Sequence, residues 1–266
     1  MGLWRRARAK SRPAGAETSQ IRVAGLDRPV AVKRSPHARR LSLRVNEAKR
    51  GAVLTLPLHV GYAEAGDFLA RHFDWLRARL AELPEPVPFA DGACFPLRGE
   101  DRELVVAARP KGRARVWLEP CTEPAESRFA SNRPPPAGRV CVLGPAHQAP
   151  VRLLHWLKGE ARGDLKDRVD HHAEGLGVRP LRISIRDQAT RWGSCSATGA
   201  LSFSWRLILA PPFVLDYVAA HEVAHLRELN HGPRFWALVA STTTRLEEAR
   251  AWLKGHGPRL HRYGTG

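Results

Sequence analysis

The feature that most constrains this chain is an apolar segment that carries two histidines and a glutamate, PFVLDYVAAHEVAHL at residues 212–226. Apolar side chains occupy almost all sides of the expected helix, which is typical of a helix buried in a protein core. The prolines at 211 and 212 suit the first turn of a helix. Polar groups in such a helix need partners, so the segment predicts a functional site.

The two histidines are placed to bind one metal ion. His221 and His225 are four residues apart, so on a helix they lie about 40° apart around the axis and roughly 6 Å apart along it. Glu222 lies beside them, where it can hydrogen-bond a water molecule on the metal. This is the H-E-x-x-H pattern of zinc hydrolases, in which zinc lowers the pKa of bound water to about 7 and the glutamate takes the proton. The pattern predicts one Zn²⁺ per chain and Glu222 as the general base.

A third metal ligand is needed to complete such a site. His231 lies six residues beyond His225, about 240° around an unbroken helix and therefore on the wrong face. The helix must end before His231, and a Gly-Pro pair at 232–233 prevents its continuation. We expect His231 to be the third ligand. The alternative is a glutamate from the following helix, Glu247 or Glu248.

Composition limits the partners and the cellular location. The 43 Lys and Arg against 26 Asp and Glu give a net charge of +17, which favours an anionic partner such as nucleic acid or a nucleotide. Well-separated cysteines without a C-x-x-C pair predict free thiols in a reducing cytoplasm. No stretch approaches 18 apolar residues and no signal peptide is visible, so we expect a cytoplasmic protein without a membrane span. The cysteines are Cys94, Cys121, Cys141 and Cys195.

The hydrophobic pattern divides the chain into three parts, and no internal repeat is visible. Residues 1–20 are expected to be a disordered basic tail. Residues 21–145 are expected to be rich in antiparallel strands, with a helix at 62–83 and a Pro- and Ser-rich loop at 119–138. Residues 146–266 are expected to form the catalytic region.

Two segments flanking the proposed site resemble a known family. RWGSCSATGALSFSWRLILAP (191–211) and YVAAHEVAHLRELNHGPRFW (217–236) resemble the YgjP-like metallopeptidase domain, which is related to SprT-like and other zincin metalloproteases. The resemblance implies an α+β fold, in which an N-terminal antiparallel β-rich part precedes a zincin-like domain built around the H-E-x-x-H helix. The loop at 119–138 does not align with the family.

The same resemblance implies roles for individual residues. His221, His225 and His231 would be the zinc ligands, and Glu222 the catalytic base. The strand before the helix would form an edge that aligns an extended substrate, which points to residues 202–206.

Two further expectations concern polar side chains outside the ligand set. A peptide hydrolase needs a group that stabilises the negative charge formed during the reaction, and four residues are candidates. Two adjacent histidines, His171 and His172, lie on an expected helix that ends near residue 176. We expect them to point apart at the surface. The candidates for charge stabilisation are Arg206, Tyr217, His256 and Tyr263.

Together these patterns predict a zinc metallopeptidase that hydrolyses peptide bonds in a protein or peptide substrate. One alternative is a zinc-dependent nucleotide pyrophosphatase, which the positive charge would suit, although the chain lacks a G-x-x-x-x-G-K-[ST] loop. Another is a protease that acts on nucleic-acid-bound proteins and docks nucleic acid through a basic surface. A binding module with structural zinc would have no use for Glu222 as a base.

Overall fold

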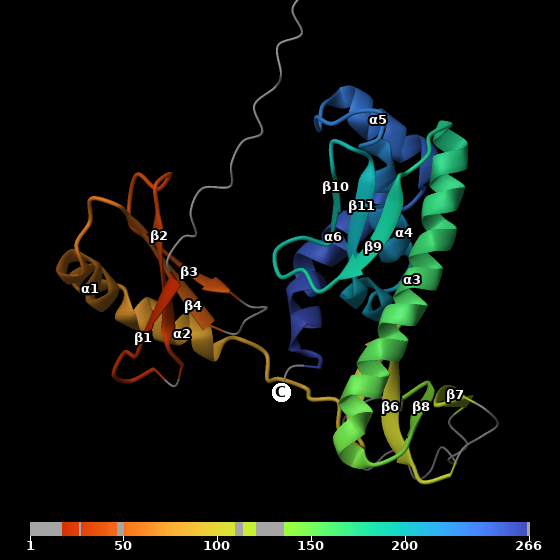
Figure 1. The fold of residues 1–266 in the computed structure, drawn as a ribbon, viewed down its shortest axis with the longest axis horizontal. Coiled ribbons are helices and arrows are strands. Elements are labelled where there is room, and N and C mark those ends of the chain that lie inside the picture. Colours follow the sequence, from red (N-terminus) through yellow and green to blue (C-terminus); the bar gives the residue numbers. More distant parts are fainter. Residues whose placement is uncertain (1–17, 27, 47–50, 110–113, 121–135, 265–266) are drawn as a thin grey trace, which may run out of the picture. The chain divides into compact units, whose positions relative to one another are not determined.

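The computed structural model describes residues 18–26, 28–46, 51–109, 114–120 and 136–264 (Figure 1). The chain forms two compact units, Met1–Leu83 and Pro84–Gly266, each with its own hydrophobic core. Strands predominate in the first unit and helices surround the proposed site in the second, so the expected α+β class is what the structure shows.

The unit boundary differs from the division expected at residue 145, because the strands after residue 84 pack into the core of the second unit. Most of the expected tail and of the loop at 119–138 lies outside the described residues. The end of the tail belongs to β1, and the two ends of the loop belong to strands β7 and β8.

The first unit is a four-stranded sheet that packs against two helices. Its sheet has the order β1-β2-β4-β3. The outer pairs are antiparallel as expected, but the central pair, β2 and β4, is parallel. Alternating hydrophobicity shows which face of each strand is buried, but not which strand is its neighbour. The elements are β1 (Thr18–Ile21), β2 (Val30–Ser35), β3 (Ser42–Asn46), β4 (Gly51–Pro57), α1 (Tyr62–Arg71) and α2 (Phe73–Ala81).

The helix expected at 62–83 is present, but it is interrupted at His72. The ring Nδ1 of His72 donates to the carbonyl oxygen of Phe68 at 2.8 Å, and the two rings stack with centroids 4.3 Å apart. The side chain thus takes the carbonyl that the His72 backbone N–H would use in a continuous helix. That N–H bonds to Leu69 O instead.

The second unit begins with a sheet that repeats the topology of the first. Its order is β5-β6-β8-β7, and again the central pair is parallel while the outer pairs are antiparallel. The sequence did not reveal this repeat, because what the two sheets share is the order and direction of their strands and not a sequence pattern. The strands are β5 (Cys94–Leu97), β6 (Glu100–Ala107), β7 (Val116–Pro120) and β8 (Gly138–Leu143).

A long helix, α3 (Ala149–Leu176), organises the second unit (Figure 1). It carries a fully buried stripe with a residue at every fourth position, on a helix that packs against α4 (Pro212–Ala224) and the neighbouring sheet. Gly177 ends it in the left-handed conformation with φ 61°. The stripe consists of Leu153, Leu157, Ala161, Leu165 and Val169.

A small sheet of three strands lies next to α4. Its order is β10-β11-β9, so β11 is the central strand and β10 an edge strand. The strand expected before the H-E-x-x-H helix stops at Ser204, whose Oγ accepts from the backbone N–H of Arg206 at 3.4 Å. Residues Trp205–Leu209 then form a 3₁₀ helix. The strands are β9 (Arg182–Arg186), β10 (Gly193–Cys195) and β11 (Ala200–Ser204).

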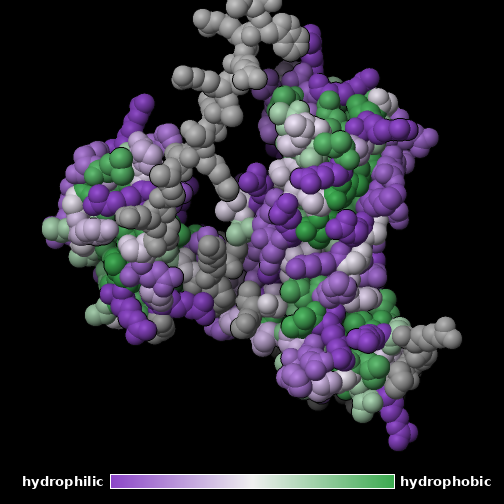
Figure 2. Space-filling model, in the orientation of Figure 1, coloured by the Kyte–Doolittle hydropathy of each residue, from purple (hydrophilic) through white to green (hydrophobic). Residues whose placement is uncertain are grey.

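Three helices complete the unit: α4 (Pro212–Ala224), α5 (Pro233–Thr242) and α6 (Leu246–His256). Hydrophilic side chains are spread over the visible surface of both units (Figure 2). Among the described helices, none combines the length and hydrophobicity that a membrane crossing requires.

Candidate metal centre

The metal helix ends where the third histidine requires it to end. α4 stops at Ala224, and the chain then turns until Gly232 caps α5. The turn brings His231 back, so that its Nε2 lies 3.1 Å from Nε2 of His221. The ligand nitrogens of His221, His225 and His231 all lie within 4.8 Å of one another. Nitrogens about 2.0–2.1 Å from a tetrahedral ion lie ~3.3 Å apart, so the donor set fits a divalent metal.

Further contacts involve the imidazoles of His225 and His221 and the backbone of His231. Nδ1 of His225 donates to the carbonyl oxygen of Glu228 at 3.1 Å, which leaves Nε2 for the metal. Tyr217 Oη lies 3.5 Å from Nδ1 of His221. Trp236 Nε1 donates to the carbonyl oxygen of His231 at 3.1 Å.

The electrostatic environment favours the neutral, metal-binding form of His221 and His225. Burial, together with the neighbouring His225, His231 and Arg250, lowers the pKa of His221 to about 4. Burial also lowers the pKa of His225, although its hydrogen bond to Glu228 opposes this. Neutral imidazoles have a lone pair free for coordination.

Glu222 lies beside the histidines with a side chain that is almost completely buried. It is 5% exposed. Burial raises its pKa to about 7, and the positive charge of Arg191 opposes that rise. On the neighbouring edge strand, a Cβ at Gly193 would lie 2.5 Å from Oε1 of Glu222. Any residue larger than glycine at position 193 would therefore push the Glu222 carboxylate out of its observed position.

We predict that Gly193→Ala displaces this carboxylate and lowers kcat by roughly 100-fold, because a misplacement of about 1 Å can have that effect. Metal binding should persist, since the three atoms nearest to such a Cβ all belong to Glu222. Kinetics and metal content measure the two effects. Gly159→Ala on α3 is the matched control, because a Cβ there meets nothing within 4 Å. A wild-type rate for Gly193→Ala would contradict the prediction.

The alternative third ligands lie outside the histidine group. Glu247 pairs with Arg250 at 2.9 Å, and Glu248 pairs with Arg245; both are i,i+3 pairs on exposed positions of α6. Among the described residues, the group of side chains able to hold a metal consists of His221, His225 and His231.

The expected charge-stabilising residues have other contacts. Arg206 is 5% exposed and donates to Asp187 and to the carbonyl oxygens of Leu260 and Tyr263, so it fixes the C-terminal segment. Tyr217 contacts the ring nitrogen of His221 that points away from His231. His256 stacks on Trp252, with ring centroids 5.2 Å apart.

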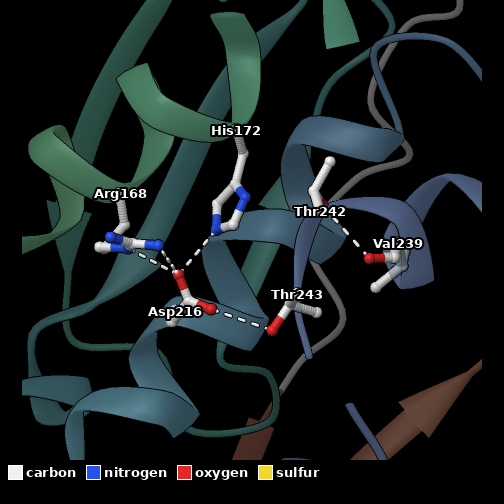
Figure 3. Close-up of polar contacts among 6 residues, drawn as sticks. All are labelled: Arg168, His172, Asp216, Val239, Thr242 and Thr243. Carbon is white, nitrogen blue, oxygen red and sulfur yellow. Dashed lines mark hydrogen bonds and ion pairs between the residues drawn. The ribbon is translucent and has the colours of Figure 1, made fainter. Parts of the chain in front are cut away.

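A partly buried polar network holds α4 against α3 (Figure 3). Asp216 of α4 accepts hydrogen bonds from Arg168 Nε at 2.6 Å and His172 Nε2 at 2.8 Å, both from α3, and from Thr243 Oγ1 at 2.9 Å. The surface position expected for His172 is wrong, since its side chain is 0% exposed. The single acidic residue in the first half of an apolar helix was the sequence signal for this network.

We predict that Asp216→Asn lowers the free energy of unfolding at pH 7 by about 2–3 kcal/mol, because the buried His172 and Thr243 lose a charged hydrogen-bond acceptor. Burial alone would raise the pKa of Asp216, but His172, Thr243 and Arg168 together lower it. A pKa below the unfolded value of about 3.9 stabilises the fold above that pH and ceases to do so as the pH falls through the folded pKa. The difference between variant and wild type should therefore shrink in acid.

Urea unfolding at neutral pH and at about pH 3 measures this effect. Asp170→Asn is the control, because Asp170 pairs with Lys166 on α3 with both side chains more than half exposed. Exposed pairs contribute at most about 1 kcal/mol. Equal losses in the two variants would argue against a special role for the network.

A family model described as YgjP-like, metallopeptidase domain, matches residues 39–256. A comparison with curated proteins finds no match. Among solved structures, the chain is similar to the crystal structure of the metallopeptidase zymogen of Pyrococcus abyssi abylysin, with 22% identity over 34% of this chain and 93% of that chain and a TM-score of 0.31.

Proposed function

The chain belongs to the YgjP-like metallopeptidase family, and on that premise we propose that it is a zinc-dependent peptidase. His221, His225 and His231 would hold the ion. The observation that carries this proposal is the gathering of their ligand nitrogens within 4.8 Å of one another, beside a buried carboxylate.

The chain's own residues would carry out the proton transfers. A bound Zn²⁺ supplies a Lewis acid that polarises the peptide carbonyl and acidifies water. The carboxylate of Glu222 accepts a proton from the attacking water and passes it to the leaving amine. Gly193 leaves the space that this carboxylate occupies, because a Cβ there would lie 2.5 Å from its Oε1.

An extended substrate would align on β10. This strand replaces residues 202–206, which were expected to form the edge, because β11 is paired on both sides and Ser204, Trp205 and Arg206 are buried. Within the described sheet, β10 pairs with β11 alone. Its second edge leaves backbone groups available for a peptide strand.

Metal analysis and hydrolysis assays on one preparation test the proposal. We expect one zinc per chain and cleavage of casein that a chelator abolishes and added Zn²⁺ restores. A panel of nucleoside triphosphates runs alongside. Chelator-sensitive hydrolysis of triphosphates without any proteolysis would replace the peptidase by the pyrophosphatase alternative. Absence of a bound metal would remove the basis of both.

A specific feature of the charge distribution supports docking to nucleic acid as a second candidate. Residues 1–60 contain 14 of the 43 Lys and Arg but only three of the 26 Asp and Glu. Most of the net charge therefore belongs to the N-terminal part, away in sequence from the metal ligands. This distribution supports a protease that docks on nucleic acid and cleaves an attached protein.

We predict that the full-length protein binds a short DNA duplex with an affinity that falls steeply with salt, because released counterions drive such binding. Fluorescence anisotropy at several salt concentrations measures it. Replacing the exposed Arg39 and Arg40 by glutamate should weaken binding at least about 10-fold. Arg179→Glu and Arg259→Glu in the second unit serve as controls. If the affinity for DNA changes neither with salt nor with the Arg39 and Arg40 substitutions, this role is excluded.

A further inference from the structure

A second concave site lies beside the metal centre, between α4 and α6. It is a cavity of about 460 Å³ that opens to solvent. Tyr217, 7% exposed, is its most buried lining residue. The remaining lining comes from α6, so the cavity lies wholly within the second unit. These residues are Glu247, Arg250, Ala251, Leu253 and Lys254.

Two lining residues connect this cavity to the metal ligands. Tyr217 precedes His221 by one helical turn, about 6 Å along the axis, and its Oη lies 3.5 Å from Nδ1 of His221. The guanidinium of Arg250 lies 4.7 Å from the ring centroid of Trp236. That ring lies 5.9 Å from the rings of both His221 and His231. The cavity is thus close enough to the three histidines for one substrate to occupy both. One of its side chains or its C-terminus would lie in the cavity while its scissile peptide bond lies at the metal.

The polar lining of the cavity is positive on balance. Arg250 and Lys254 face a single acid, Glu247. The Arg250–Glu247 pair is 46% and 78% exposed, and exposed pairs of this kind are weak. The ion pairs found within the described ranges do not include Lys254. The guanidinium of Arg250 has five N–H donors, so it can bind a second carboxylate without leaving Glu247.

We propose that this cavity is a substrate subsite for a carboxylate near the scissile bond. The carboxylate would come from an acidic side chain or from the C-terminus of the peptide, and Arg250 and Lys254 would bind it. This inference rests on the proposed peptidase function. The subsite would make the enzyme prefer peptides that carry an acidic side chain near the scissile bond or a free C-terminal carboxylate.

The test uses peptides that differ in one charge. In one series, a glutamate or a glutamine occupies each position on either side of the scissile bond; in the other, the C-terminus is a free acid or an amide. We expect kcat/KM to be about 10-fold higher for the charged member of one pair, as for a charge-assisted contact. The pair that shows the difference identifies the source of the carboxylate.

The decisive variant is Lys254→Glu, because it reverses a charge at the exposed rim of the cavity. It should abolish or invert the preference while the uncharged peptide is still cleaved. Lys254→Arg should keep the preference, and Arg179→Glu, which does not line the cavity, should leave it unchanged. An unchanged preference in Lys254→Glu, or no preference in the wild type, would overturn the subsite.

A binding measurement separates failure of the subsite from failure of the peptidase. Fluorescence anisotropy with the same labelled peptides needs no cleavage. If the wild type cleaves none of them, the proposed function fails. The cavity is still a carboxylate-binding site if the charged peptide binds about 10-fold more tightly and loses that advantage in Lys254→Glu. Equal binding of charged and uncharged peptides would reject the subsite by itself.

Discussion

Glu222→Gln is expected to lower kcat for peptide hydrolysis by roughly 10²–10⁴-fold, the usual contribution of a general base. Glutamine has nearly the shape of glutamate but cannot accept the proton. The side chain is 5% exposed, so bulk water does not replace it easily. Metal content should stay at the wild-type level, because the group able to hold a metal does not include Glu222.

Kinetics and metal analysis on the same preparation check this expectation. Glu174→Gln, an exposed position on α3, is the control and should behave as the wild type. Full activity of Glu222→Gln would mean that another group accepts the proton. Loss of the metal together with activity would instead place Glu222 among the ligands.

His231→Ala is expected to weaken metal binding by at least about 100-fold, since even residues that only support a ligand change affinity by 10–100-fold. His231 is exposed, so the metal-free protein should unfold at nearly the wild-type urea concentration. Competition with a chromogenic chelator gives the affinity. Activity should fall with metal occupancy and return in part at high zinc concentration.

The matched comparisons are Glu247→Gln and Glu248→Gln. These residues pair with arginines on α6, and we expect both variants to keep the wild-type metal affinity. If either loses the metal while His231→Ala retains it, the third ligand is a glutamate and the proposed ligand set is wrong.

Local patterns in the sequence predicted that the three histidines lie close together. The four-residue spacing of His221 and His225 and the helix stop before His231 depend only on helix geometry, and the structure brings the three rings together. The limits of α3 also agree with its apolar period. These features need no knowledge of distant contacts.

Features that depend on pairing between distant segments were not predictable. The parallel central pair in each four-stranded sheet and the edge position of β10 follow from strand order. The buried state of His172 follows from Asp216, 44 residues later. A periodic pattern shows which side of an element is buried, but the identity of the partner comes from the other element.

The three histidines come from one short stretch of chain, 221–231. This short separation limits how much a bound ion can stabilise the folded protein. A crosslink stabilises a protein mainly by restricting its unfolded chain, and the restriction is small when the closed loop is short. Removal of the ion should therefore loosen only the turn after α4. The hydrophobic core should keep its protection against hydrogen exchange, and the metal-free chain should remain folded and ready to bind zinc again.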